Sequence, residues 1–224
     1  MEEIKCSLRE RKHAKMKLAI MSVFVGCLEK SRFEDISIRE ICRRIDISEG
    51  TFFNYFPEKI DIINYYMHLR FLAVIWKARN DVPRGLGGLA LIDAVFQRIT
   101  EELNNPNAFY QMISVLLIQK TRPKEVSIPD IEKRIAFPNY EGIENIASTR
   151  IEDFLEQCLK EAAGKGDLPR DVKIDDVLVS LMAILGGTLL AIKFVDIEDR
   201  EYHYERQLKL LWKGLGVRKM ARIK

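Results

Sequence analysis

The residues best suited to chemistry lie in one short stretch, where small polar side chains that can form hydrogen bonds follow one another closely. Thr51 and Asn54 are small polar side chains in a helical pattern, where they either touch base edges or face water. Glu49 can accept from a cytosine amino group, although a solvent-facing acid fits as well. Phe52 either reaches a thymine methyl or lies in the core. Gly50 leaves room for the backbone to approach a partner closely.

Nothing in the sequence points as clearly to catalysis or to a metal. There is no HExxH, GxSxG, Walker-type or dinucleotide-binding glycine pattern, and neither the histidines nor the cysteines are spaced as ligands. We therefore expect no metal, no cofactor and no enzyme activity, and a site assembled only by the fold stays as the alternative. Scattered cysteines are typical of reduced thiols in a cytosol. The residues concerned are His13, His68, His203, Cys6, Cys27, Cys42 and Cys158.

Two short helices are expected to position this stretch. Ser37 and Glu40 have the spacing of a capping box, and isoleucines follow at helical intervals. Ser48 is a natural N-cap for the second helix, which Pro57 ends. Because about four residues join the two patterns, the sequence predicts a helix-turn-helix unit.

A basic helix is expected to precede this unit. Ser7 with Glu10 forms a second candidate capping box, and no glycine or proline follows until Gly26. The 36 basic and 33 acidic residues of the 224-residue chain leave a net charge of only +3, so the distribution of charge matters more than its total. The basic end can lie beside phosphate or be a solvated face. It contains Lys5, Arg9, Arg11, Lys12, Lys15 and Lys17.

The rest of the chain also reads as helical. No segment alternates apolar and polar residues, so we expect an all-α protein. The apolar run from Val177 to Ile192 is bounded by charged residues and is too short for a membrane span, which favours a buried helix. The charged start of the chain does not resemble a secretory signal. Helical patterns cover 58–80, 86–103, 106–117, 130–135, 139–163, 171–195 and 198–215.

Residues 8–62 resemble the DNA-binding domain of the TetR family of bacterial transcriptional regulators. The sharpest match is Ile41-Cys42 with the segment ISEGTFFNYFPEK, from Ile47 to Lys59. Phe53 stands where the family usually has tyrosine, which removes a hydroxyl often used on a phosphate. The segment GDLPRDV, from Gly166, followed by an apolar helix with Gly186-Gly187, is similar to the entry of the family's penultimate helix.

The resemblance implies roles for individual residues. Tyr55 matches an aromatic or histidine position beside the DNA backbone, and Lys59 matches a lysine that pairs with a phosphate. The predicted phosphate contacts are Ser37, Ser48, Gly50, Tyr55 and Lys59, and the predicted base contacts are Thr51, Asn54, Phe52 and Glu49. An apolar ligand cavity would use a subset of large residues that otherwise form core, namely Tyr66, Phe71, Trp76, Phe96, Phe109, Met112, Phe154 and Met182.

Together these observations predict two domains, a three-helix DNA-binding domain at 1–57 and a helical regulatory domain at 58–224. The resemblance implies a cytoplasmic repressor that binds a palindromic operator as a homodimer through its last two helices. A small apolar or amphipathic effector would release it from double-stranded DNA, with no membrane partner. The alternative is a helical enzyme or interaction protein without specific DNA binding.

Overall fold

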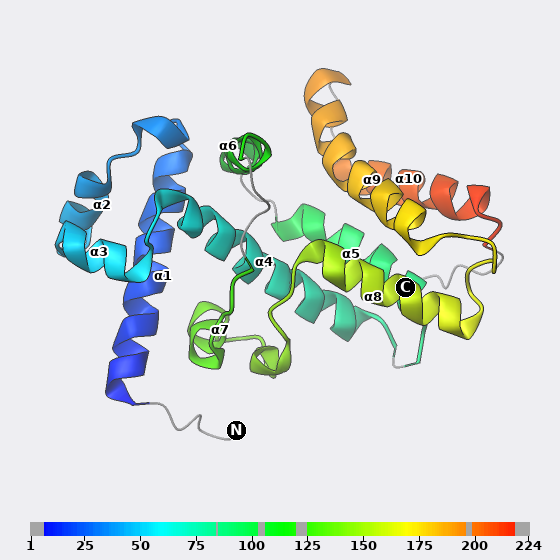
Figure 1. Cartoon of the computed structure of the whole chain (residues 1–224), viewed down its shortest axis with the longest axis horizontal. Coiled ribbons are helices and arrows are strands. Elements are labelled where there is room, and N and C mark those ends of the chain that lie inside the picture. Colours follow the sequence, from blue (N-terminus) through cyan, green and yellow to red (C-terminus); the bar gives the residue numbers. More distant parts are fainter. Residues whose placement is uncertain (1–6, 84, 103–105, 120–124, 196–198, 218–224) are drawn as a thin grey trace. The chain divides into compact units, whose positions relative to one another are not determined.

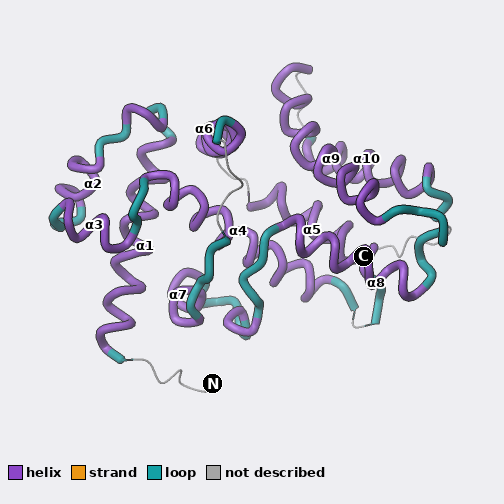
Figure 2. Tube along the Cα trace, in the orientation of Figure 1, coloured by secondary structure: helices purple, strands orange, loops and turns teal. Residues whose placement is uncertain are grey.

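The computed structural model describes residues 7–83, 85–102, 106–119, 125–195 and 199–217, and over these residues it contains helices and loops but no strand (Figure 2). The all-α prediction is confirmed. The chain forms two compact units, one drawn from 1–73 and 103–148 and the other from 74–102 and 149–224. The boundary falls within α4 (Lys59–Asp81), so this one helix contributes residues to both units.

The first unit contains the expected N-terminal helices together with a later part of the chain (Figure 1). α1 packs against α2, α6 and α7, and α2 packs against α3. Side chains of α1, α2 and α3 with no exposed surface form a common core, among them Phe24, Ile41 and Phe52. Besides the start of α4, the elements are α1 (Leu8–Leu28), α2 (Ile38–Arg44), α3 (Glu49–Tyr55), α6 (Pro106–Leu117), α7 (Asp130–Ala136), and the 3-10 turns η1 (Phe33–Asp35) and η2 (Ile143–Asn145).

Serine caps fix where the N-terminal helices begin, as the sequence predicts. At α1 the capping box is complete, because Ser7 Oγ accepts from the Glu10 amide and the Glu10 carboxylate accepts from the Ser7 amide. Ser37 Oγ accepts from the Glu40 amide at 3.4 Å, and Ser48 Oγ accepts from the Thr51 amide at 3.0 Å. These bonds satisfy amides that the first turn of a helix leaves unpaired.

The second unit is built from the end of α4 with α5 (Gly88–Glu102), α8 (Ile151–Lys165), α9 (Ile174–Val195) and α10 (Arg200–Gly214). α5 packs against α8 and α10, and α9 packs against the same two helices. A Cβ atom added to Gly88 would lie 1.9 Å from the Cys158 carbonyl oxygen, so α5 and α8 touch backbone to backbone. Polar bonds tie α10 to its neighbours, since Tyr204 donates to the Leu185 carbonyl and Trp212 donates to Asp93.

One helix starts later than the sequence predicts. The expected helix from residue 139 is wrong up to residue 150, because α8 begins at Ile151 and the preceding segment forms only η2. Gly142 adopts a left-handed φ of 76°, which interrupts a right-handed helix. The ammonium of Lys133 also donates to the carbonyl oxygens of Glu144 and Ile146 in this segment. Lys5 and Cys6, and residue 198 at the start of the last expected helix, lie outside the described residues.

The apolar helix α9 is less buried than expected. Its window Ile174–Ala191 is long and apolar enough to span a membrane by composition, a test that core helices of soluble proteins also pass, and only 22% of it is buried within the chain. Val179 is 68% exposed and Phe194 is 82% exposed. The prediction that this helix is buried is therefore wrong for a single chain. Instead, α9 exposes an apolar surface.

Candidate nucleic-acid interface

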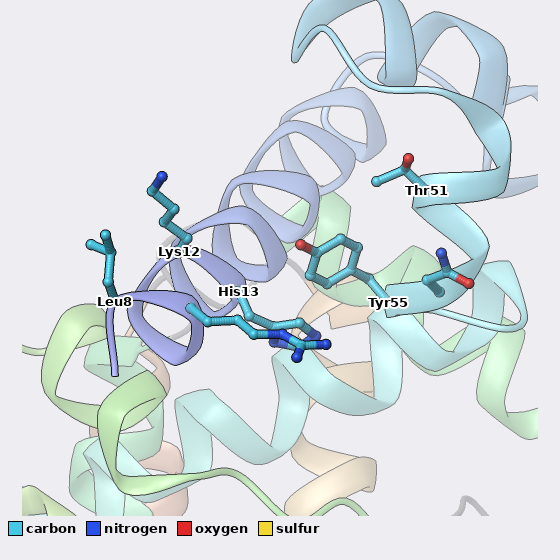
Figure 3. Close-up of a pocket in the computed structure, with 7 residues that line it drawn as sticks. Leu8, Lys12, His13, Thr51 and Tyr55 are labelled. Atoms are coloured by element: carbon cyan, nitrogen blue, oxygen red, sulfur yellow. The ribbon is translucent and has the colours of Figure 1, made fainter. Parts of the chain in front are cut away.

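The structure brings Thr51 and Asn54, two of the four predicted base contacts on α3, together with Arg9 and Lys12 of α1. A hollow of about 640 Å³ lies between the two helices. Figure 3 shows Tyr55 reaching from α3 toward α1, where its ring lies over His13, with ring centroids 4.5 Å apart. The hollow is lined by Leu8, Arg9, Lys12, His13, Thr51, Asn54 and Tyr55.

Thr51 and Asn54 differ in how firmly they are held. Thr51 is half-buried, and its hydroxyl forms a hydrogen bond of 2.9 Å with the hydroxyl of Ser48. This bond orients Thr51, and Ser48 Oγ also accepts from the backbone amide of Thr51 as the cap of α3. Asn54 is exposed on the same hollow, where its amide has both donors and an acceptor to offer. A well-positioned hydroxyl and an exposed amide are the groups that read base edges.

Other predicted contacts on α3 are engaged within the chain. Glu49 forms an exposed ion pair with Arg39 of α2, with Nε and Oε1 3.1 Å apart. Phe52 has no exposed surface and its ring meets Phe53 edge to face at 5.4 Å, which supports the packing alternative rather than contact with a thymine methyl. Phe53, the departure from the family tyrosine, is 44% exposed and presents a ring but no hydroxyl.

Lys59 binds the chain itself. Its ammonium donates to the carbonyl oxygens of Phe33 at 2.6 Å, Ile36 at 3.3 Å and Glu34 at 3.4 Å. It also lies 4.4 Å from the centroid of the Phe33 ring. Burial lowers the pKa of this lysine. Since an ammonium has three hydrogens and three carbonyls surround it, Lys59 holds the start of α4 against η1.

The remaining predicted phosphate contacts line open surface. Ser37 borders a second hollow, of about 390 Å³, together with Arg39 and Lys59. Gly50 is exposed, and an added Cβ would meet only the Ser48 hydroxyl, at 3.8 Å. The chain itself therefore does not require glycine at this position, which leaves close approach by a partner as the predicted reason for it.

Two groups that fix α1 were not singled out from the sequence. The Gln111 amide of α6 donates to the carbonyl oxygens of Leu28 and Ser31 and accepts from the amide of Phe33. Glu132 of α7 is another such group, described further below. In a sequence, a single glutamine in an apolar helix and a single glutamate in a charged turn look like solvent-exposed residues. No sequence pattern therefore marks Gln111 or Glu132 as structural.

The eight predicted ligand residues are divided between the two units. Tyr66, Phe71, Phe109 and Met112 belong to the first unit, and Trp76, Phe96, Phe154 and Met182 belong to the second. Phe96 is almost fully buried and meets Tyr204 edge to face at 5.6 Å, which is a core contact. The structure does not assign these residues to one cavity, so their ligand role stays a prediction.

The fold is that of TetR-family regulators. The chain aligns with Thermus thermophilus FadR, a TetR-family transcriptional repressor in complex with lauroyl-CoA, at a TM-score of 0.64 and 19% identity, covering 92% of this chain and 98% of that one. It aligns with a candidate fatty acid metabolism regulator from Clostridium perfringens at 0.56 and 19%, covering 91% and 100%. A TetR transcriptional regulator from a Rhodococcus species aligns at 0.54 and 15%, covering 90% and 97%.

Comparisons that use the sequence without the structure find no relative. No protein-family model matches the chain, and no curated protein matches it either. At 14–19% identity the similarity to regulators shows the shared helical fold. A shared fold does not fix what a chain binds, which depends on the residues of its own site.

Proposed function

We propose that this chain is a DNA-binding transcription regulator, not an enzyme, and that it reads an operator through α3 with the basic end of α1 on the backbone. The main support for this proposal is that Thr51 and Asn54 line the same hollow as Arg9 and Lys12. Polar side chains on a short exposed helix supply base contacts, and flanking cations supply salt-sensitive affinity for phosphate. A fold shared with TetR-family repressors supports this assignment.

Within this interface the contacts divide by chemistry. Thr51 and Asn54 read bases, while Tyr55, Arg9 and Lys12 bind phosphate oxygens. Ser37, Ser48 and Gly50 stay as proposed neighbours of the backbone. Lys59 acts through the position of α4, because carbonyl oxygens of its own chain surround its ammonium.

We infer that the active form is a homodimer that pairs α9 and α10 with the same helices of a second copy. Large apolar side chains are exposed there, and contiguous exposed apolar surface marks an interface. A hollow of about 340 Å³ between α9 and α10 includes Gly187, whose added Cβ would meet nothing within 4 Å. The exposed residues are Val179, Leu190, Phe194, Val195, Tyr202 and Leu210.

A two-fold dimer would place two copies of α3 in successive major grooves, about 34 Å apart, on a palindromic operator. Repression follows if the operator overlaps a promoter, and the protein then works in the cytoplasm with DNA. The functional division proposed is 1–57 for reading DNA and 58–224 for regulation and dimerisation, although α6 and α7 pack with the first unit.

The regulating signal is proposed to be a small apolar or amphipathic molecule. The structural neighbour from Thermus thermophilus holds lauroyl-CoA, which is an amphipathic molecule. Among the large apolar residues predicted for such a site, Phe71, Met112 and Phe154 are buried. By linkage, the effector must bind the DNA-free arrangement more tightly than the DNA-bound one to release the operator.

A gel-shift titration with the DNA upstream of the gene tests the proposal. The expected result is a specific complex whose affinity falls steeply with salt, because bound phosphates release counterions. A scrambled duplex of the same length and composition is the control. Equal binding to both duplexes, or no binding at low salt, would overturn the regulator assignment and favour an interaction protein.

A further inference from the structure

Two polar side chains of α4 are buried in the first unit, and neither of them belongs to the proposed DNA interface on α1 and α3. Asn64 is 6% exposed and His68 is 9% exposed. They are four residues apart on one helix and therefore share a face. Ile63, Leu69 and Leu72, which are close to them in sequence on α4, are apolar and even more deeply buried. A polar pair in such surroundings needs an explanation.

The hydrogen bond that His68 makes determines which of its ring nitrogens can accept a hydrogen bond from a ligand. Its Nδ1 lies 2.8 Å from the backbone carbonyl oxygen of Asn64. A carbonyl oxygen only accepts, so Nδ1 carries the hydrogen, and in the neutral ring Nε2 carries a lone pair. Nε2 has no hydrogen-bond partner in the part of the chain that the structure describes, and the same is true of Asn64 Oδ1.

Unpaired polar atoms in the interior destabilise the folded state, whereas apolar side chains of similar size at both positions would not. The folded chain therefore gains nothing from this pair by itself. A binding partner that completes the two hydrogen bonds gives the pair a role. The partner has to be small, because both side chains are enclosed, and mostly apolar, because their neighbours are.

Building on the proposed function of a ligand-responsive regulator, we propose that Asn64 and His68 form the polar end of the effector site, and that the effector is an apolar molecule carrying a hydroxyl group. The hydroxyl donates its hydrogen to His68 Nε2. Because that hydrogen is then used, the hydroxyl oxygen can only accept, so the Asn64 amide turns by half a turn and donates to it from Nδ2. An ionised carboxylate has no hydrogen for Nε2, so it is the poorer match.

The position of this pair also connects it to α1. Tyr65 lies between the two residues in sequence, and its hydroxyl donates to Glu132 of α7 at 2.7 Å. Glu132 in turn pairs with Lys17 of α1. A ligand that shifts this turn of α4 therefore acts on a helix that carries the proposed phosphate contacts.

Calorimetric titration of the full-length protein with 1-octanol and with its methyl ether tests the inference. The two probes differ by the hydrogen that the ether lacks. We expect 1-octanol to bind at least tenfold more tightly than the ether, and we expect this preference to vanish in the double variant N64L/H68L. The variant M67L on the same helix is the matched control and should keep the preference.

Several results would overturn the inference. Equal affinity for alcohol and ether, a preference that survives in N64L/H68L, or no binding of any primary alcohol from hexanol to dodecanol would each do so. A more stable N64L/H68L variant without alcohol binding by the wild type would identify a buried water site instead. If the double variant does not fold, the single variants N64L and H68Q replace it, and each should lower the alcohol preference at least threefold.

A gel shift without alcohol separates this inference from the proposed function. Specific DNA binding that 1-octanol does not weaken contradicts the effector class while the regulator assignment stands. Absence of specific DNA binding contradicts the regulator assignment, whatever the alcohol does.

Discussion

Glu132 of α7 and Lys17 of α1 form an ion pair with the ammonium nitrogen 3.3 Å from the carboxylate oxygen, and their side chains are only 3% and 16% exposed. The hydroxyl of Tyr65 donates to the same carboxylate, and the ammonium lies 4.3 Å from the centroid of the Tyr65 ring. Burial raises the pKa of the tyrosine, and the charge of Glu132 and the hydrogen bond to it raise this pKa further. The carboxylate thus joins three helices of the first unit, α1, α4 and α7.

Glu132→Gln is expected to lower the free energy of unfolding by about 3–5 kcal/mol, because it leaves the Lys17 ammonium without its counter-charge in a largely buried place. Urea unfolding measures the change. The exposed pair of Arg32 and Asp35 provides the control, and Asp35→Asn should leave the unfolding curve nearly unchanged because water screens this pair. Equal effects of the two substitutions would show that the Glu132 pair is not a structural tie.

Gly88→Ala should prevent α5 and α8 from packing as they do. The added methyl would lie 1.9 Å from the Cys158 carbonyl oxygen, so the helices must separate, at a cost of about 3 kcal/mol or more. Gly164→Ala is the matched control on α8, where an added Cβ meets nothing within 4 Å. That change should be neutral or stabilising by up to about 1 kcal/mol in thermal unfolding. Two similar melting curves would refute the backbone contact.

Asp93 should make stability depend on pH. Burial raises the pKa of this carboxyl to about 6 against an ordinary 3.8, although the hydrogen bond from Trp212 opposes the shift. The folded state therefore holds the proton more tightly, and its contribution to stability is present below about pH 4 and is lost as the pH rises toward 6. Asp93→Asn keeps an acceptor for Trp212 and avoids the buried charge.

The variant should accordingly be more stable than the wild type by about 1–3 kcal/mol above pH 7, with the difference disappearing near pH 4. Chemical unfolding at a series of pH values gives the two curves. A difference that stays constant with pH would mean that Asp93 does not titrate as described.

The two sides of the α1 and α3 hollow should respond differently to substitution. Asn54→Ala should reduce discrimination between operator variants by about 1–3 kcal/mol, since a base contact carries sequence preference. Lys12→Ala should weaken all duplexes alike and reduce the salt slope by about 1, since a phosphate contact carries charge only. Gel shifts at several salt concentrations measure both. If Asn54→Ala weakened all duplexes alike and Lys12→Ala reduced discrimination, α1 would read the bases and α3 would bind the backbone.

Phe194→Glu should convert the proposed dimer into monomers. A carboxylate in a self-associating apolar face is desolvated twice, once in each copy, which opposes association. Sedimentation measures the mass. Glu156→Gln on α8, outside the apolar face, should leave the mass unchanged. A dimer that persists in Phe194→Glu would place the interface elsewhere.

The sequence by itself determined the local features of this protein. Capping serines at Ser7, Ser37 and Ser48 predicted where the N-terminal helices start, and the structure confirms each one. Helical spacing without alternation predicted the all-α fold. Caps and periodicity depend on residues three or four positions apart, so they are legible without a structure.

Only the tertiary structure decided what the functional side chains face. It buried Phe52, engaged Lys59 with carbonyl oxygens some 23 to 26 residues away, and joined Glu132 to Lys17 across 115 residues. It also placed the Lys133 ammonium on carbonyl oxygens of the segment expected to be helical from 139. Such contacts depend on which helices meet in space, and periodicity along one helix does not carry that information.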